Sequence, residues 1–178
     1  MSIVISVIES NRKFYIASDK RGERGGIKSD SYKKICQLDK DLYFGMTGIY
    51  EAGLVVLNHI RSCNLNDINS LTEKISEFFA SFSGRNKPEK LTIMVAGRDN
   101  TGNFFIWQRN IQGETKLMNG SENIEYALSS NDKIEILAKY FEKQIISGSE
   151  VKDAIAKTIQ YASDIDSSIS KEYELYEI

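Results

Sequence analysis

The sequence predicts an α+β fold, a four-layer αββα sandwich in which two antiparallel sheets pack together and a helix pair covers each outer face. Segments with the period of a strand occur in blocks, and segments with the period of a helix occur in pairs. A doubly wound parallel sheet would instead alternate single strands with single helices. The chain has 178 residues and no repeat or low-complexity linker, so one domain over residues 1–178 is expected.

The first half of the chain predicts four strands followed by two helices. Gly22, Gly25 and Gly26 precede a polar loop rather than a helix start, so they predict a flexible turn and not a phosphate-binding loop. Asp39-Lys40-Asp41 predicts the turn of a hairpin. Strand patterns cover 3–8, 14–18, 35–38 and 42–47, and helical patterns cover 50–63 and 68–82.

The second half repeats this order and adds one strand. The final residues, 172–178, alternate between apolar and polar as in an edge strand. Stacking the elements in this order buries every apolar stripe, which supports the sandwich. Strand patterns cover 91–96, 104–109, 115–118 and 124–128, and helical patterns cover 134–145 and 151–162.

Composition excludes several classes of function. The chain is 41% apolar and 27% charged with a net charge of −2, which predicts neither nucleic-acid nor membrane binding. No apolar stretch approaches a membrane span, and the first residues lack the pattern of a signal peptide, so a cytoplasmic location is expected. Cys36 and Cys63 are expected to be reduced packing residues. The one histidine, His59, lies in a helical pattern, so neither a serine–histidine–aspartate triad nor a metal site or other cofactor is expected.

Ser2 offers a nucleophile that needs no histidine. If Met1 is removed, the new α-amine lies beside the Ser2 hydroxyl, and its ordinary pKa of about 7.7–8.0 leaves part of it neutral as a base. The start of a buried strand would hold both groups inside a cleft. If Met1 is retained, this base does not exist, and Ser2 is only a small residue after the initiator.

Two charged residues and a glycine are expected near Ser2. Asp19 ends the second strand, and by strand alternation Lys34 points inward at the start of the third while Lys33 points outward. A buried Lys34 would lower the pKa of the α-amine, and Asp19 would keep Lys34 charged. The alternative is a surface ion pair. Gly48 could present its backbone N–H to an oxyanion, or it could serve an ordinary turn.

These residues carry a resemblance to a known family. The opening SIVISV, the DKR after the second strand, KKICQL, GMTG running into a helix, and YASDIDSS near the end look like the proteasome β-subunit family. Within that family the bacterial HslV peptidases are the closer comparison. The resemblance covers the whole chain in element order, and it implies the N-terminal-nucleophile hydrolase fold.

The resemblance also implies roles for the matching residues. Ser2 would be the nucleophile, where most of the family has threonine. ALSSND lacks the family's flanking glycines, so the serine that assists the α-amine could be Ser130 or Ser129. The implied catalytic residues are Ser2, Asp19, Lys34, Gly48, Ser130, Asp164 and Ser167, of which the last two hold the amine network. The implied substrate-binding residues are Tyr32, Cys36, Met46 and Tyr50, which form an apolar or aromatic-tolerant side-chain pocket, and Arg21, which matches the arginine that the family commonly has two residues after the acid.

The expected activity is hydrolysis of peptide bonds through an acyl-enzyme on Ser2. The resemblance implies a self-compartmentalising ring of identical subunits that acts on peptides or unfolded proteins, with an unfoldase ATPase as partner. Two other interpretations stay open. One is a non-catalytic ring subunit that retains Met1, and the other is an N-terminal-nucleophile amidase that acts on a small amide.

Overall fold

The strands form two antiparallel sheets and a short hairpin. The computed structural model describes residues 2–10, 13–24, 27–61, 68–82, 88–120, 123–130 and 133–178. One sheet has the order β10-β1-β2-β11, the other has the order β5-β6-β7-β8-β9, and β3 pairs with β4. The strands are β1 Ile3–Glu9, β2 Lys13–Asp19, β3 Gly22–Arg24, β4 Ile27–Ser29, β5 Ile35–Asp39, β6 Leu42–Gly48, β7 Leu91–Arg98, β8 Phe104–Asn110, β9 Thr115–Asn119, β10 Ile124–Ser130 and β11 Tyr173–Glu177.

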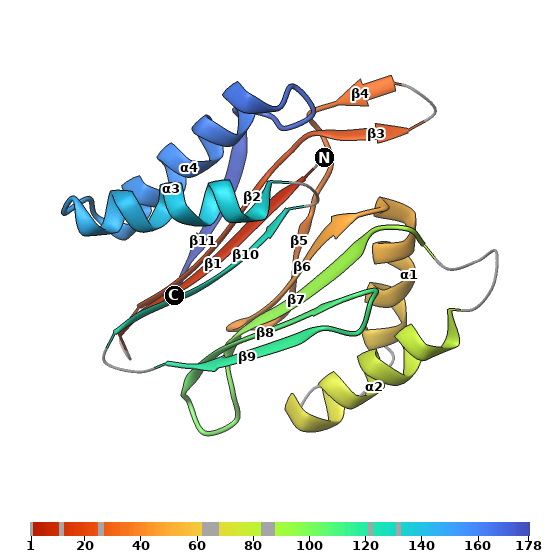
Figure 1. Cartoon of the computed structure of the whole chain (residues 1–178). Coiled ribbons are helices and arrows are strands. Elements are labelled where there is room, and N and C mark those ends of the chain that lie inside the picture. The colour runs from red at the N-terminus through yellow and green to blue at the C-terminus, as the bar shows by residue number, and fades with distance from the viewer. Residues whose placement is uncertain are drawn as a thin grey trace.

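Each sheet carries two helices on one face (Figure 1). Helices α1 (Tyr50–Arg61) and α2 (Ile68–Ser81) lie over the five-stranded sheet. Helices α3 (Ile134–Ile146) and α4 (Val151–Ile165) lie over the four-stranded sheet. In the part of the chain that the structure describes, every helix is too short or too polar to cross a membrane.

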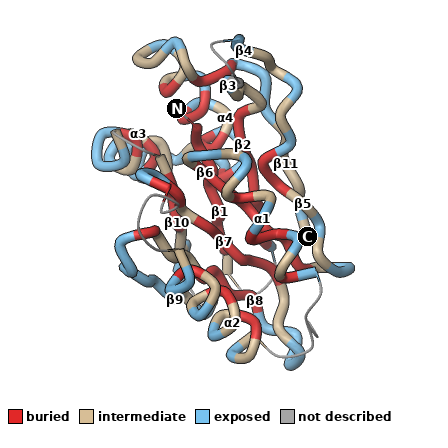
Figure 2. Tube along the Cα trace, turned by 90° about the vertical axis from the view of Figure 1, so that its right-hand side faces the viewer, coloured by how far each residue is buried: buried red, intermediate tan, exposed pale blue. Residues whose placement is uncertain are grey.

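Three apolar clusters hold the sheets and helices together. Strand β1 contributes to two of them, because its side chains alternate between its two faces. Ile5 and its neighbours at alternate positions pack against α3 and α4, whereas Val4 and Ile8 pack with Met94 of the other sheet. A third cluster, which includes Phe44, lies between the five-stranded sheet and the pair α1 and α2. Figure 2 shows β1 buried along almost its whole length. A continuous apolar run is what a strand covered on both faces requires.

The structure confirms the mixed α/β class, the antiparallel strand pairing and the edge position of β11. The prediction for Gly22 is wrong, because this residue begins strand β3, which pairs with β4, rather than lying in a flexible turn. A Cβ atom on Gly22 would overlap the ring of Tyr32, so this glycine allows close packing rather than a loose turn. Gly25, Gly26 and Cys63 lie outside the described residues.

Candidate active site

The carboxylate of Asp19, at the end of β2, is fully buried and accepts hydrogen bonds from four donors. Oδ1 accepts from the Ile3 N–H at 2.9 Å and from Lys34 Nζ at 2.7 Å. Oδ2 accepts from the N–H of Arg21 at 3.0 Å and from the N–H of Ser170 at 3.3 Å. Because a buried charge is costly unless it is paired and hydrogen-bonded, this arrangement stabilises an ionised carboxylate next to the start of β1.

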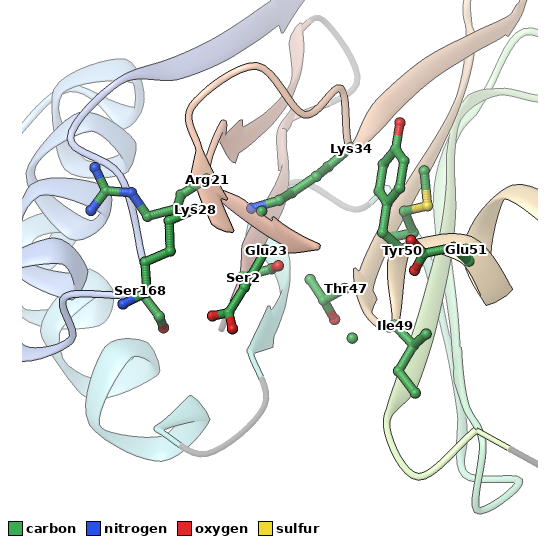
Figure 3. A pocket seen from close by; sticks show the side chains of 13 residues that line it. Ser2, Arg21, Glu23, Lys28, Lys34, Thr47, Ile49, Tyr50, Glu51 and Ser168 are labelled. Atoms are coloured by element: carbon green, nitrogen blue, oxygen red, sulfur yellow. The ribbon is translucent and has the colours of Figure 1, made fainter. Parts of the chain in front are cut away.

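Lys34 directly precedes β5 and is buried, with 3% of its side chain exposed, whereas Lys33 is exposed. This is the pattern that strand alternation predicted. Burial lowers the pKa of Lys34 below its ordinary value, and Asp19 opposes this effect by stabilising the charged form. The side chain extends toward Ser2 (Figure 3). Lys34 is therefore a cation that can lose its proton more readily than a surface lysine.

Ser2 lies at one end of β1, where it lines a cavity of about 230 Å³ together with Lys34 and residues 46–51. Only 8% of Ser2 is exposed. The β3–β4 hairpin lies beside this end of β1 in Figure 1 and contributes Glu23 and Lys28 to the same cavity. Met1, on whose removal the predicted base depends, lies outside the described residues.

Gly48 ends β6 with φ of +102°, a conformation that favours glycine. A Cβ atom at this position would also overlap the carbonyl oxygen of Lys90. The Met46 N–H donates to the Lys34 carbonyl at 3.1 Å, and by strand alternation the Gly48 N–H points to the same edge of β6. It is therefore directed to the side on which Lys34 lies, as an oxyanion donor would need to be.

The geometry distinguishes Ser129 from Ser130. Ser129 lies opposite Val4 in the β1–β10 pair, so it shares the face of the sheet toward which Ser2 also points by alternation. Its Oγ lies 2.5 Å from Thr47 Oγ1 of the other sheet. Ser130 points to the opposite face, and its buried Oγ has no hydrogen-bond partner among the described residues. Ser129 thus fits the assisting role better. Thr47 was not among the predicted residues, although alternation after Met46 turns it toward the other sheet.

The structure does not bring Asp164 and Ser167 to the cavity, which corrects the assignment made from the sequence. Asp164 is still within α4, is exposed, and lies 3.0 Å from Lys171 Nζ. Ser167 is exposed as well. After α4 ends, Asp166 adopts an extended conformation and its Oδ1 accepts from Ser168 N–H at 2.8 Å and Ser168 Oγ at 2.6 Å.

Asp166 and Ser168 are therefore the acid and the serine nearer to the cavity, because Ser168 lines it. Burial raises the pKa of Asp166, but the hydrogen bonds from Ser168, together with nearby positive charge such as that of Lys133, hold the pKa below its ordinary value. The nearby carboxylate is thus kept ionised. The end of α4, and not the residue spacing, decides which acid faces this region.

Arg21 lines the cavity, but its guanidinium is engaged within the protein. Nε and Nη2 donate to the two carboxylate oxygens of Asp30 at 2.6 and 2.7 Å. Nη1 donates to the Ser167 carbonyl at 3.0 Å. The bidentate contact with Arg21 lowers the pKa of Asp30, and the bond to Ser167 ties the hairpin region to the loop that carries Ser168.

Of the residues predicted to form a side-chain pocket, some line the cavity and others pack against the lining residues. Met46 and Tyr50 line the cavity. The ring of Tyr32 packs edge-to-face on the ring of Tyr50, with centroids 4.8 Å apart. Cys36 is half-buried against the cluster that contains Met46, and burial raises the pKa of its thiol. An apolar wall therefore lies next to Gly48.

Within the described ranges, no group of three or more His, Cys, Asp or Glu side chains could hold a metal ion. His59 lies on α1, where its ring stacks on Phe78 of α2 with centroids 4.6 Å apart.

Comparisons with known proteins place this geometry in a known fold. No family profile and no curated protein matches the sequence. A solved structure of eukaryotic HslV from Trypanosoma brucei is similar over 98% of both chains, with 14% identity and a TM-score of 0.74. Anbu (ancestral beta-subunit) from Yersinia bercovieri is similar over 99% of this chain and 81% of its own, with 12% identity and a TM-score of 0.76. The chain therefore has the proteasome-like fold of HslV and Anbu, as its sequence predicted.

Proposed function

We propose that the protein is an N-terminal-nucleophile peptidase of the proteasome-like type, with Ser2 as its nucleophile after removal of Met1. The observation that carries this proposal is the buried pair of Asp19 and Lys34, of which Lys34 lines a cavity together with Ser2 and Gly48. A buried ion pair at a cavity wall is costly for stability alone. Its position beside a hydroxyl supports a catalytic use.

The chemistry would run in two halves. The neutral α-amine of Ser2 takes the proton from Ser2 Oγ, directly or through one water, and Oγ attacks the carbonyl carbon of the substrate. The oxyanion accepts a hydrogen bond from the Gly48 N–H. The tetrahedral species then expels the leaving amine of the substrate, which takes its proton from the α-ammonium of Ser2. Water attacks the acyl-enzyme with the α-amine again as base, releasing the acid and restoring Ser2.

The surrounding charges would tune this base. The positive charge of Lys34 disfavours a second cation nearby and so lowers the pKa of the α-amine. Asp19 holds Lys34 in place. Ser129, bonded to Thr47, and the pair of Asp166 and Ser168 are the best candidates for groups that orient the amine.

Met46 and Tyr50 support apolar substrate side chains, and the substrates are peptides or unfolded proteins. The three apolar clusters support the αββα layer order within a single domain of residues 1–178. The fold likeness supports a homo-oligomeric ring, and the resemblance to HslV supports an unfoldase ATPase partner.

Intact mass of protein made in its native host is the first test. We expect the mass to be lower by one methionine, because the proposed base exists only after that cleavage. Uniform retention of Met1 would contradict the peptidase and favour the non-catalytic ring subunit.

Substitution of Ser2 in processed protein is the second test. Ser2→Ala should reduce hydrolysis of short peptides by at least about 10³-fold without changing the melting temperature, because the attacking oxygen is lost. Ser2→Thr should keep much of the activity, because it keeps a hydroxyl at the same place. Near wild-type activity in Ser2→Ala would remove Ser2 from the mechanism, and hydrolysis of small amides but not peptides would favour an amidase.

A further inference from the structure

Glu174, on β11, is an acidic residue that the proposed mechanism does not use. It lies opposite Ser18 in the β2–β11 pair and is partly buried. Tyr176, two residues later on the same face, packs its ring near that of Tyr43 in the other sheet, with centroids 5.1 Å apart. Glu174 therefore points into the space between the sheets, where a carboxylate needs hydrogen-bond donors.

Donors reach Glu174 from both sheets. Oε1 accepts from Ser18 Oγ and from the Ile35 N–H, each at 3.2 Å, and Oε2 accepts from the Tyr176 hydroxyl at 3.2 Å. Ile35 lies on β5, an edge strand of its sheet. Just before β5, the Lys34 carbonyl accepts a hydrogen bond from the Met46 N–H of β6. The next N–H along the strand, that of Ile35, therefore points away from β6. Glu174 thus satisfies a buried N–H on the open edge of β5.

These contacts adjoin the candidate catalytic pair on both sides. Ser18 immediately precedes Asp19, and Ile35 immediately follows Lys34. One carboxylate oxygen therefore joins the two backbone segments whose side chains form the ion pair. The charge of Glu174 acts on the pair as well: burial lowers the pKa of Lys34, and Asp19, then Asp30 and then Glu174 raise it.

We propose that Glu174 is a positioning residue that holds Lys34 against Asp19 and thereby keeps Lys34 beside Ser2. Its catalytic consequence rests on the proposed function, whereas its effect on Lys34 does not. Glu174 does not line the cavity, so it acts through Lys34 and not on the substrate.

Kinetics of two Glu174 variants test the positioning role. Glu174→Ala leaves Ser18 and Ile35 without their acceptor, so we expect kcat to fall by about 10–100-fold while KM stays within about twofold. Glu174→Gln keeps a carbonyl oxygen that can accept both bonds, so kcat should stay within about threefold of wild type. Glu177→Gln is the matched control, because Glu177 lies on the same strand with its carboxylate at the surface near Lys152. It should change neither constant.

The pKa of Lys34 gives a second readout, measured by NMR on protein with labelled lysine side chains. A nearby negative charge stabilises the protonated lysine, so its loss in Glu174→Gln should lower this pKa by roughly 0.3 unit or more. The acidic limb of the kcat/KM profile, which reports the pKa of the α-amine, should also move to lower pH, because the same loss of negative charge disfavours the protonated amine. Glu177→Gln should leave both unchanged.

The outcomes separate the two proposals. An inactive wild type with a lowered Lys34 pKa in Glu174→Gln would overturn the proposed function but support the link between Glu174 and Lys34. An active wild type with unchanged kcat in Glu174→Ala would overturn the positioning role and leave the function standing. If Glu174→Ala does not fold, Glu174→Gln decides: a loss of more than about tenfold in kcat, although both hydrogen bonds can still form, overturns the positioning role.

Discussion

Two aspartate–lysine pairs in this protein have similar lengths but opposite surroundings. Asp19 and Lys34 lie 2.7 Å apart with 0% and 3% of their side chains exposed. Asp164 and Lys171 lie 3.0 Å apart with 54% and 65% exposed. The buried carboxylate also accepts three backbone N–H groups, whereas the exposed one accepts only a long bond from Gln160 at 3.4 Å among the described contacts.

The difference shows what burial does to an ion pair. Water screens the exposed pair and replaces either partner at little cost. The buried pair has no such replacement, so losing one partner leaves an uncompensated charge in the interior. Distance alone therefore does not identify a functional pair. The following predictions begin with the buried pair and end with the exposed one.

Asp19→Ala should have the largest effect. It removes the acceptor of Lys34 and of three backbone N–H groups, so we expect a loss of about 3–5 kcal/mol in the free energy of unfolding. Urea denaturation followed by circular dichroism measures this loss. A change below about 1 kcal/mol would mean that the pair is solvated and that the comparison fails.

Lys34→Met should follow, with a loss of about 2–3 kcal/mol and no hydrolysis of short peptides. The loss is smaller because Asp19 keeps its three N–H donors. Lys33→Met is the control: its side chain is exposed, so stability and activity should stay at the wild-type level. The same two measurements, urea denaturation and peptide hydrolysis, check both variants. The opposite ranking would contradict the position of Lys34 at the site.

Gly48→Ala should cost about 1–3 kcal/mol, because alanine at φ of +102° is strained and its Cβ meets the Lys90 carbonyl. Any relaxation moves the proposed oxyanion donor, so kcat should fall more than KM rises. Steady-state kinetics on folded variant protein measures this. Equal effects on both constants would argue against the oxyanion role.

Ser129→Ala should cost about 1 kcal/mol, because Thr47 loses its partner across the two sheets. Ser130→Ala should leave the free energy of unfolding nearly unchanged, since the Ser130 hydroxyl has no hydrogen bond among the described residues. Denaturation and hydrolysis of both variants compare the two serines directly. A larger loss of activity in Ser130→Ala would restore Ser130 as the assisting serine.

Lys171→Ala should have the smallest effect. The pair with Asp164 is exposed, so the urea midpoint and the hydrolysis rate should not change measurably. A clear loss of activity would return Asp164 to the site.

The sequence predicted most of the fold because periodicity is a local property. The run at Ile3–Glu9 and the apolar spacing of α2 each specify an element and its buried face, whatever it packs against. The same alternation distinguished Lys34 from Lys33. The sequence did not predict the β3–β4 hairpin, because its strands are three residues long, too short to show a period.

The candidate site could be predicted only where it depends on strand ends. Ser2, Asp19 and Gly48 lie at the ends of strands that the sequence marks clearly. The acid at the end of α4 could not be read from spacing, because the extended conformation of Asp166 after Ile165 decides that Asp166, and not Asp164, accepts hydrogen bonds from Ser168.

The sequence by itself determined the elements, their buried faces and the residues at the start and end of each strand. The tertiary structure alone decided which hydroxyl joins Thr47 and that Glu174 bridges β2 and β5. These contacts join residues that are close in space but mostly far apart along the chain. Their formation depends on how the two sheets pack, and no local pattern encodes that packing.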